Sequence, residues 1–194
     1  KGLYMSLILR PNEALTVPAQ ITIAAAVDVC RAVETLTGLA PKIKWVNDLY
    51  LNGRKICGIL TESIGEIESG RIETLVVGIG LNIALAPEDL PDELRVTAGS
   101  IGRTDIPRAR FAGEIAGRLL SRCENFADVQ CLNEYRARSL VLGQHVSFMH
   151  KSAEVSGVAE AVDSEGRLLV RMPDESLLTL SSGKISLCSF PKEI

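Results

Sequence analysis

Two lysines, an asparagine and an aspartate lie on either side of one tight-turn signal in the first third of the chain. Lys44 and the pair Asn47-Asp48 precede the turn, and Lys55 follows it. A lysine held on a strand presents a point charge that suits carboxylate or phosphate. The alternative for Lys55 is a solvated hairpin side chain beside Arg54.

The turn itself is predicted by Leu51-Asn52-Gly53-Arg54, because Asn and Gly both tolerate the positive φ that a type I′ hairpin turn requires. Side chains alternate along a strand, so alternate members of each arm share a face. We therefore expect Lys44, Asn47 or Asp48, and Lys55 to gather near one end of a sheet, with apolar residues beneath them.

Three glycines in predicted strands, Gly58, Gly78 and Gly80, are also candidates for function. Glycine inside a strand often marks the close approach of a ligand, or else a bulge. The Gly-x-Gly pair alone makes no dinucleotide fingerprint, because no third glycine or helix follows properly. Asn82 comes next, and its amide offers both a donor and an acceptor. Asn82 otherwise reads as an ordinary start to a loop.

These residues fall into motifs that resemble the core of biotin protein ligases. The matching stretches are Lys44-Trp45-x-Asn47-Asp48, Arg54-Lys55-Ile56-x-Gly58-Ile59-Leu60, Gly78-Ile79-Gly80-Leu81-Asn82, Leu3-Tyr4-Met5-Ser6 and Ser182-Gly183-Lys184-Ile185-Ser186-Leu187. They keep the family order and extend over most of the chain. The family has proline where this chain has Val46, which bears on local rigidity and leaves the polar groups unchanged.

The resemblance implies an ATP-dependent biotin–protein ligase that uses biotin, ATP and Mg²⁺. Such an enzyme forms biotinyl-5′-AMP and then transfers biotin to a lysine of a carrier protein, the biotin carboxyl carrier protein of acetyl-CoA carboxylase. The transition state at the α-phosphorus gathers negative charge, so fixed cations and Mg²⁺ are the main catalytic requirement. The acceptor protein would bind through its own hairpin, one strand of which would pair with an exposed edge of the sheet.

The resemblance also assigns roles to individual residues. Lys55, Lys44 and Asp48 are the expected catalytic residues. Binding of biotin and ATP is expected of Lys55, Asn47, Gly58, Leu60, Gly78, Gly80 and Asn82, and Asn82 is also the expected metal contact. Lys44 either assists with phosphate charge or pairs with Asp48. Asp48 either orients a lysine, reaches Mg²⁺ through water, assists deprotonation of the incoming amine, or caps backbone.

The elements that must position these residues are predicted from periodicity. The first domain, 1–141, has a strand at Leu3–Leu9 and a core helix that Thr16 caps, with Pro18 in its first turn, and that runs to Leu36 before Gly38. Strands at 43–50, 55–64 and 72–79 form an antiparallel meander, with a turn at Ser69-Gly70. Helices follow from Pro107 to Phe126 and from Val129 to Arg138.

Two kinds of side chain are expected to have structural roles only. Trp45 is expected to pack in the core in preference to contacting adenine, and the arginines 108, 110, 118 and 122 are expected to form a solvated helix face.

A second domain, 142–194, is predicted because the sequence after Gly143 changes to short strand-like segments. Five short strands are expected: His145–Met149, Ala153–Val162, Arg167–Arg171, Leu177–Leu180 and Lys184–Ser189. They suggest a small SH3-like β-barrel. The fold class is therefore α+β, a mixed and largely antiparallel sheet with helices on one side, followed by the barrel. Through the resemblance, the first domain is expected to be class II aminoacyl-tRNA synthetase/biotin ligase-like.

The bulk properties exclude several other classes. A hydrophobic content of 46% with 23% charged residues is typical of a globular protein. The net charge of −3 and aromatic content of 4% give no footprint for nucleic acid. Five scattered cysteines without a C-x-x-C fit free thiols in a reducing cytosol, so a cytoplasmic location is expected. No apolar run is long enough for a membrane helix, and the start shows no signal peptide.

Two further expectations concern what lies outside these residues. The chain starts abruptly in what reads as a mid-domain strand at Leu3, and the Gly/Arg-rich loop of the family is absent, so an upstream part of the domain is expected. An upstream helix-turn-helix would add DNA binding, and the family suggests a homodimer. The alternatives are a lipoate–protein ligase-like enzyme and a non-catalytic biotin-sensing regulator.

Overall fold

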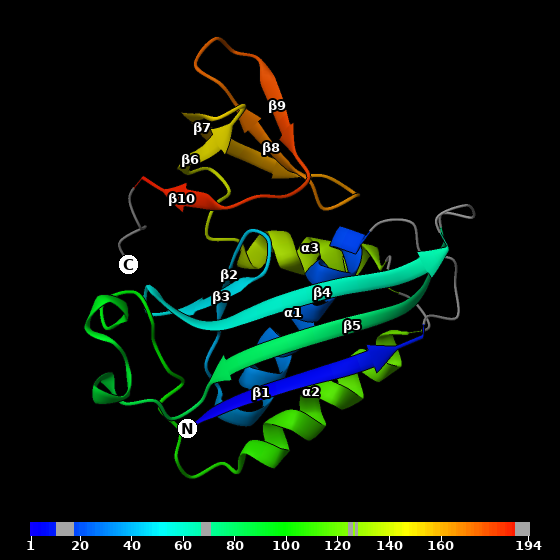
Figure 1. The fold of residues 1–194 in the computed structure, drawn as a ribbon, viewed down its shortest axis with the longest axis vertical. Helices are drawn as coiled ribbons and strands as arrows, with labels where there is room; N and C mark the ends of the chain where they lie inside the picture. Colours follow the sequence, from blue (N-terminus) through cyan, green and yellow to red (C-terminus); the bar gives the residue numbers. More distant parts are fainter. Residues whose placement is uncertain (11–17, 67–70, 124–125, 127, 189–194) are drawn as a thin grey trace.

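The computed structural model describes residues 1–10, 18–66, 71–123, 126 and 128–188. Within these ranges the chain forms two five-stranded antiparallel sheets and three α-helices (Figure 1). The large sheet has the order β1-β5-β4-β3-β2 and the small sheet the order β10-β6-β7-β8-β9. The elements of the first part are β1 (Gly2–Leu9), α1 (Pro18–Thr37), β2 (Lys42–Lys44), β3 (Asp48–Leu51), β4 (Arg54–Glu66), β5 (Arg71–Asn82), the 3₁₀ turns η1 (Pro87–Asp89) and η2 (Asp92–Leu94), α2 (Arg108–Arg122) and α3 (Val129–Arg138).

The helices cover one face of the large sheet, behind the strands in Figure 1. Alternation decides which side chains meet them: Leu75, Val77 and Ile79 of β5 are buried, whereas their neighbours are half-buried. α1 supplies the opposing layer through residues such as Ala25 and Val29, which are fully buried. We call the opposite face of the large sheet, which carries no helix, the open face.

The expected helix boundaries are largely confirmed. α1 ends where Gly38 adopts a φ of 73° and donates its backbone N–H to the carbonyl of Glu34 at 2.8 Å. α3 has the expected bounds, with the Asp128 side chain capping it by accepting from the N–H of Gln130. The expected cap at Thr16 and the turn at Ser69-Gly70 lie outside the described residues.

The strand expected over 43–50 is wrong. This stretch forms two short strands, β2 and β3, that pair with each other in the register Ile43 with Leu49 and Lys44 with Asp48. The intervening residues 45–47 form a turn because three hydrogen bonds, described below, hold them. The predicted Asn52-Gly53 turn is confirmed, with φ values of 50° and 70°.

The small sheet follows the expected strand pattern within one or two residues at each end. Its strands are β6 (His145–His150), β7 (Ala153–Val162), β8 (Leu168–Arg171), β9 (Leu177–Leu180) and β10 (Ile185–Leu187). Val146, Ala159, Leu168 and Val170 are completely buried, which gives the small sheet an apolar core of its own. No helix among the described residues is long and apolar enough to cross a membrane.

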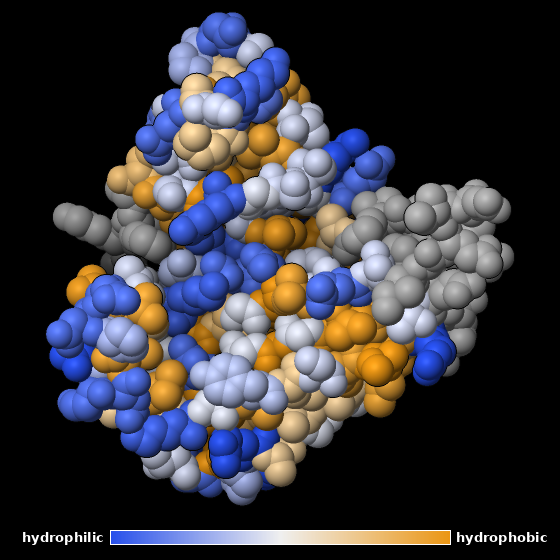
Figure 2. Space-filling model, viewed as in Figure 1, coloured by the Kyte–Doolittle hydropathy of each residue, from blue (hydrophilic) through white to orange (hydrophobic). Residues whose placement is uncertain are grey.

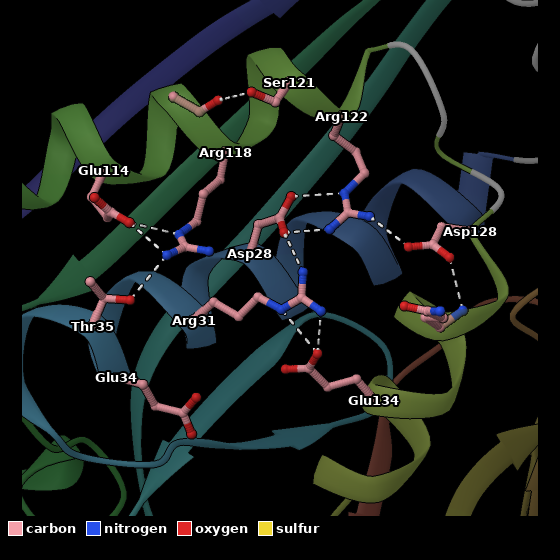
Figure 3. Close-up of polar contacts among 12 residues, drawn as sticks. Asp28, Arg31, Glu34, Thr35, Glu114, Arg118, Ser121, Arg122, Asp128 and Glu134 are labelled. Atoms are coloured by element: carbon pink, nitrogen blue, oxygen red, sulfur yellow. Dashed lines mark hydrogen bonds and ion pairs between the residues drawn. The ribbon is translucent and has the colours of Figure 1, made fainter.

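The arginines of α2 are not all a solvated face. Figure 3 shows the Arg122 guanidinium directed at Asp28 of α1, with donor–acceptor distances of 2.6 and 3.0 Å. Asp28 is 1% exposed, so it is a buried carboxylate that requires this partner. Arg118 donates to Glu114 and to the Thr35 hydroxyl. The expectation fails because α2 packs against α1, and that contact cannot be read from the α2 sequence.

Candidate functional site

The glycines singled out in the sequence lie side by side on the open face. The register pairs Gly58 with Gly80 and Leu60 with Gly78 across β4 and β5, and Ser6 with Gly78 and Tyr4 with Gly80 across β1 and β5. Paired residues in antiparallel strands point to the same face. The glycines therefore form a shallow floor, which we call the glycine floor, with Tyr4 76% and Leu60 60% exposed beside it.

A β-bulge brings Lys55 to this same face. Asp48 pairs with Gly58 and Leu49 with Cys57, but Tyr50 then pairs with Lys55, so that Ile56 is an extra residue in β4. Lys55 is three positions before Gly58, and in a regular strand that odd separation would direct its side chain into the helix layer; the bulge returns it to the face of Gly58. The backbone of Lys55 is fixed from the other side, because its N–H donates to the Thr97 carbonyl at 2.9 Å.

Lys55 and Asp48 form an ion pair directly above the floor. The Lys55 Nζ lies 2.5 Å from Asp48 Oδ1, with the two side chains 42% and 24% exposed. A Cβ added to Gly58 would lie 3.4 Å from Lys55 Nζ and 3.8 Å from Asp48 Oδ1. The ion pair places Asp48 against Lys55, while its charge also acts on the neighbouring Lys44; the role of Asp48 stays a prediction.

Lys44 lies beside this pair. Its Nζ is 5.9 Å from the centre of the Tyr50 ring, a cation–π distance. Burial lowers the pKa of Lys44, and the positive charges of Lys184 and Lys55 lower it further, while Asp48 opposes them. Lys184 comes from the small sheet, just before β10. Sequence reasoning gave it no role, because only the fold brings it near Lys44.

The two asparagines use their amide groups to fix backbone. Asn47 Nδ2 donates to the Ile59 carbonyl at 2.6 Å, while the Ile59 N–H donates to the Asn47 carbonyl at 3.0 Å. Asn82 Nδ2 donates to the Gly99 carbonyl at 2.9 Å, which ties the loop after β5 to the end of that strand. In each of these bonds the side-chain NH₂ group is the donor, so the side-chain amide oxygen is the candidate acceptor for a ligand.

Among the described residues, no group of three or more His, Cys, Asp or Glu side chains could hold a metal ion. Asp48 is occupied by Lys55, and Asn82 offers at most one amide oxygen. His145 and His150 belong to β6 of the small sheet. The described chain therefore provides no complete set of metal ligands, and a cation here would depend on oxygens brought by a ligand.

Trp45, as expected, is a core residue, 3% exposed. The register runs from Lys44 through Asp48 and Gly58 to Gly80, which places the lysines on the same face as the glycine floor. In Figure 2 hydrophilic surface gathers where the small sheet meets the open face, next to paler and hydrophobic surface along the strands. This arrangement can hold an anion against fixed positive charge while a flat apolar group lies on the glycines. A cavity of about 730 Å³ lies on the helix side, among Asp28, Arg118 and Arg122, and none of the predicted site residues lines it.

Comparisons with known proteins match both parts of the chain. Residues 1–82 match the biotin/lipoate A/B protein ligase family, and residues 141–188 match the biotin protein ligase C-terminal domain. The chain is similar to a biotin–[acetyl-CoA-carboxylase] ligase of Paracoccus denitrificans, with 32% identity over 87% of this chain and 73% of that protein. It is also 33% identical to the bifunctional ligase/repressor BirA of Bacillus subtilis, over 96% of this chain, and spans 58% of the length of that relative.

Solved structures agree with the fold. The biotin protein ligase of Aquifex aeolicus in complex with biotin and ATP superposes with a TM-score of 0.77 at 24% identity, covering 96% of this chain and 78% of that one. A biotin protein ligase-like protein of unknown function from Silicibacter gives a TM-score of 0.74 at 17% identity, over 93% of this chain and 78% of that one. The two sheets and their helices are therefore an arrangement that other chains share, and the expected fold class is confirmed.

Proposed function

We propose, from the premise that this chain belongs to the biotin protein ligase family, that its open face forms biotinyl-5′-AMP from biotin and ATP and then passes biotin to a carrier lysine. We assign residues 1–141 to the catalytic domain and 142–194 to a C-terminal SH3-like domain. The free cysteines support a cytoplasmic location.

The observation that carries the proposal is the Lys55–Asp48 pair above the glycine floor. In this proposal biotin lies with its ring on Gly58, Gly78 and Gly80, beside Leu60, and directs its carboxylate to Lys55. The carboxylate oxygen attacks the α-phosphorus, the bond to the β-phosphate oxygen breaks, and pyrophosphate leaves. Lys55 and Lys44 stabilise the charge that grows on the phosphoryl oxygens.

Asp48 keeps the Lys55 ammonium directed at the floor in this scheme. After the adenylate forms, the carrier lysine attacks the biotinyl carbonyl and AMP leaves with its bonding electrons. The amine loses a proton in this step, and in this proposal the Asp48 carboxylate, which lies beside Lys55, accepts it. The acceptor is a biotin carboxyl carrier protein, whose hairpin adds to an exposed sheet edge.

The nucleotide is assigned to the two asparagines and to Mg²⁺. Asn47 and Asn82 each keep an amide oxygen for ATP, since their amide N–H groups bind Ile59 and Gly99. Mg²⁺ would be held mainly by the phosphate oxygens of ATP, with Asn82 as the contribution of this chain, and when bound it supplies further positive charge to the phosphates. Homodimer formation and DNA binding through an upstream domain stay predictions.

The test is transfer of labelled biotin to a carrier domain in the presence of ATP and Mg²⁺. We expect labelled carrier only when all components are present, and a labelled adenylate when the carrier is omitted. Calorimetric titration with biotin and with lipoate separates the alternative acid, and we expect binding of biotin alone. Binding of lipoate without biotin, or tight biotin binding without adenylate, would reject the proposal.

A further inference from the structure

We propose that Tyr135 of α3 and Gly166 of the small sheet are positioning residues for Asp48, acting through the turn 45–47. This inference rests on the proposed function, because it concerns the same site. It gives the C-terminal part of the chain a defined role in the chemistry, in addition to any contact with a ligand.

The first contact is made by the indole of Trp45. Its Nε1–H donates to the carbonyl of Gly166 at 3.0 Å, across 121 positions of sequence, and the bond is buried. Trp45 is 3% exposed, so loss of this partner would leave a buried donor unsatisfied. The turn that precedes Asp48 is thus bonded directly to the turn between β7 and β8.

Gly166 is held in a position that only glycine fits. Its φ is 83°, and an added Cβ would lie 2.7 Å from Ile23 Cδ1 and 3.1 Å from the Ala19 Cβ of α1. Asp163 fixes the same turn, since its Oδ1 accepts the N–H groups of Glu165 and Arg167, both at 2.9 Å. The carbonyl that receives the indole is therefore rigidly placed against α1.

Tyr135 supplies the second contact. Its hydroxyl donates to the carbonyl of Val46 at 3.0 Å, and its ring is completely buried. Burial raises the pKa of Tyr135, so the hydroxyl keeps its proton at neutral pH and remains a donor. Together with the Asn47 bond to Ile59, these contacts give each residue of the turn 45–47 its own fixed partner.

The consequence falls on Asp48, which is the next residue along the chain and the first of β3. Its carboxylate orients Lys55 at 2.5 Å, so any tilt of the turn changes the direction of the ammonium. Misplacement of a reacting group by about 1 Å costs up to about a hundredfold in rate. Tyr135 and Gly166 touch no reacting atom in this scheme, and their effect passes through Asp48.

The experiment compares two variants with matched controls. Tyr135→Phe removes only the hydroxyl, and Ser121→Ala is its control, because the Ser121 hydroxyl donates to the Gly117 carbonyl at 3.0 Å on the other helix, α2. Gly166→Ala adds a methyl group at positive φ, and Gly38→Ala is its control, since Gly38 has a φ of 73° and no heavy atom within 4 Å of an added Cβ. Adenylate formation is measured as kcat and as KM for biotin, well below the unfolding temperature of every variant.

We expect kcat to fall roughly tenfold in Tyr135→Phe and more in Gly166→Ala, with KM for biotin changed less than twofold, because the glycine floor is built by β4 and β5. Trp45 is the one tryptophan of the sequence, so its emission reports the Gly166 contact independently of activity. Its emission should change in Gly166→Ala and stay unchanged in Gly38→Ala.

The outcomes separate the two proposals. If the parent protein forms no adenylate, the proposed function is rejected and this inference with it. If the parent is active and both test variants keep its kcat, or lose no more than their controls, the inference alone is overturned. A rise in KM for biotin with constant kcat would also overturn it, since that result places the effect on the floor.

Discussion

At the scale of single residues, the Lys55 charge is expected to contribute more to catalysis than to the stability of the fold. The Lys55–Asp48 pair is short but partly exposed, with Lys55 42% accessible to solvent. Exposed pairs of this kind contribute about 0–1 kcal/mol to folding, because water screens the charges and long side chains lose entropy. A fixed cation at a developing anion, by contrast, contributes about 3–4 kcal/mol to a transition state.

Lys55→Ala is therefore expected to abolish adenylate formation while the free energy of unfolding falls by less than about 1 kcal/mol. The measurement is the rate of labelled biotinyl-AMP formation, together with urea unfolding of the same variant. Arg171→Ala serves as control, because Arg171 pairs with Glu160 at the surface of the small sheet. Adenylate accumulating at the parental rate in Lys55→Ala would remove this lysine from the mechanism.

Lys184 gives a prediction about pH. Its positive charge lowers the pKa of Lys44, after burial, which is the larger cause. Replacement by alanine removes a repulsive charge, so the pKa of Lys44 rises and Lys44 stays protonated to higher pH. In Lys184→Ala the alkaline limb of the kcat/KM profile for adenylate formation should thus move to higher pH.

The control for this shift is Lys42→Ala on the same hairpin, because Lys42 is not among the charges that set the pKa of Lys44. An alkaline limb that moves equally in both variants, or to lower pH in Lys184→Ala, would contradict the assignment of the limb to Lys44.

At the scale of elements, local sequence signals predicted most of the strands and turns around the candidate site, but not the direction in which Lys55 points. The Asn52-Gly53 turn, α1 and the strands of the small sheet follow from local signals, and the structure confirms them. The extra residue Ile56, which turns Lys55 toward the glycines, has no local signal, since a bulge depends on the strand it pairs with. The split of 43–50 into β2 and β3 likewise depends on partners far along the chain, Tyr135 and Gly166.

The glycine floor predicts a variant that affects binding and leaves the fold intact. An added Cβ at Gly80 would lie 3.5 Å from Tyr4 Cδ1, an ordinary contact, so the strands need not shift. Gly80→Ala should be as stable as the parent, or more stable by up to about 1 kcal/mol. The methyl group occupies the floor, so KM for biotin should rise at least tenfold. Gly113→Ala on α2, with no atom within 4 Å, should leave KM unchanged.

The α1–α2 contact gives a prediction about stability. Asp28 is buried against Arg122, whose side chain is 11% exposed (Figure 3). Asp28→Asn leaves a buried guanidinium without its main counter-charge, which costs about 3 kcal/mol or more. Urea unfolding of Asp28→Asn should show this loss with normal adenylate kinetics below the transition. The control is Asp105→Asn, which breaks the exposed pair with Arg103 and should have the same free energy of unfolding as the parent. An equal loss of stability in both variants would contradict the importance of burial.

At the scale of the whole molecule, the two sheets are joined by polar contacts that pass through backbone carbonyls. Arg136 of α3 donates to the carbonyl of Val162 at 2.8 and 2.6 Å, and Gln20 donates to the carbonyl of Ser164 at 3.1 Å. The Trp45 indole N–H donates to the Gly166 carbonyl at 3.0 Å. The small sheet is thereby tied to α1, to α3 and to the turn 45–47 between β2 and β3, and we expect the protein to unfold as one unit.

Arg136→Ala tests that coupling. The Val162 carbonyl belongs to a completely buried residue, and removal of its charged donor should lower the free energy of unfolding by about 2 kcal/mol. In the parent, Trp45 emission and far-UV circular dichroism should give coincident urea transitions, because Trp45 lies at the junction. In Arg136→Ala the emission should change at a lower urea concentration than the dichroism, because the small sheet separates first.

The control is Arg171→Ala, which breaks only contacts within the small sheet. It should keep the two transitions together, because the contacts between the sheets are unchanged. Separate transitions already in the parent would mean that the sheets fold independently, and the small sheet could not then hold the hairpin in place.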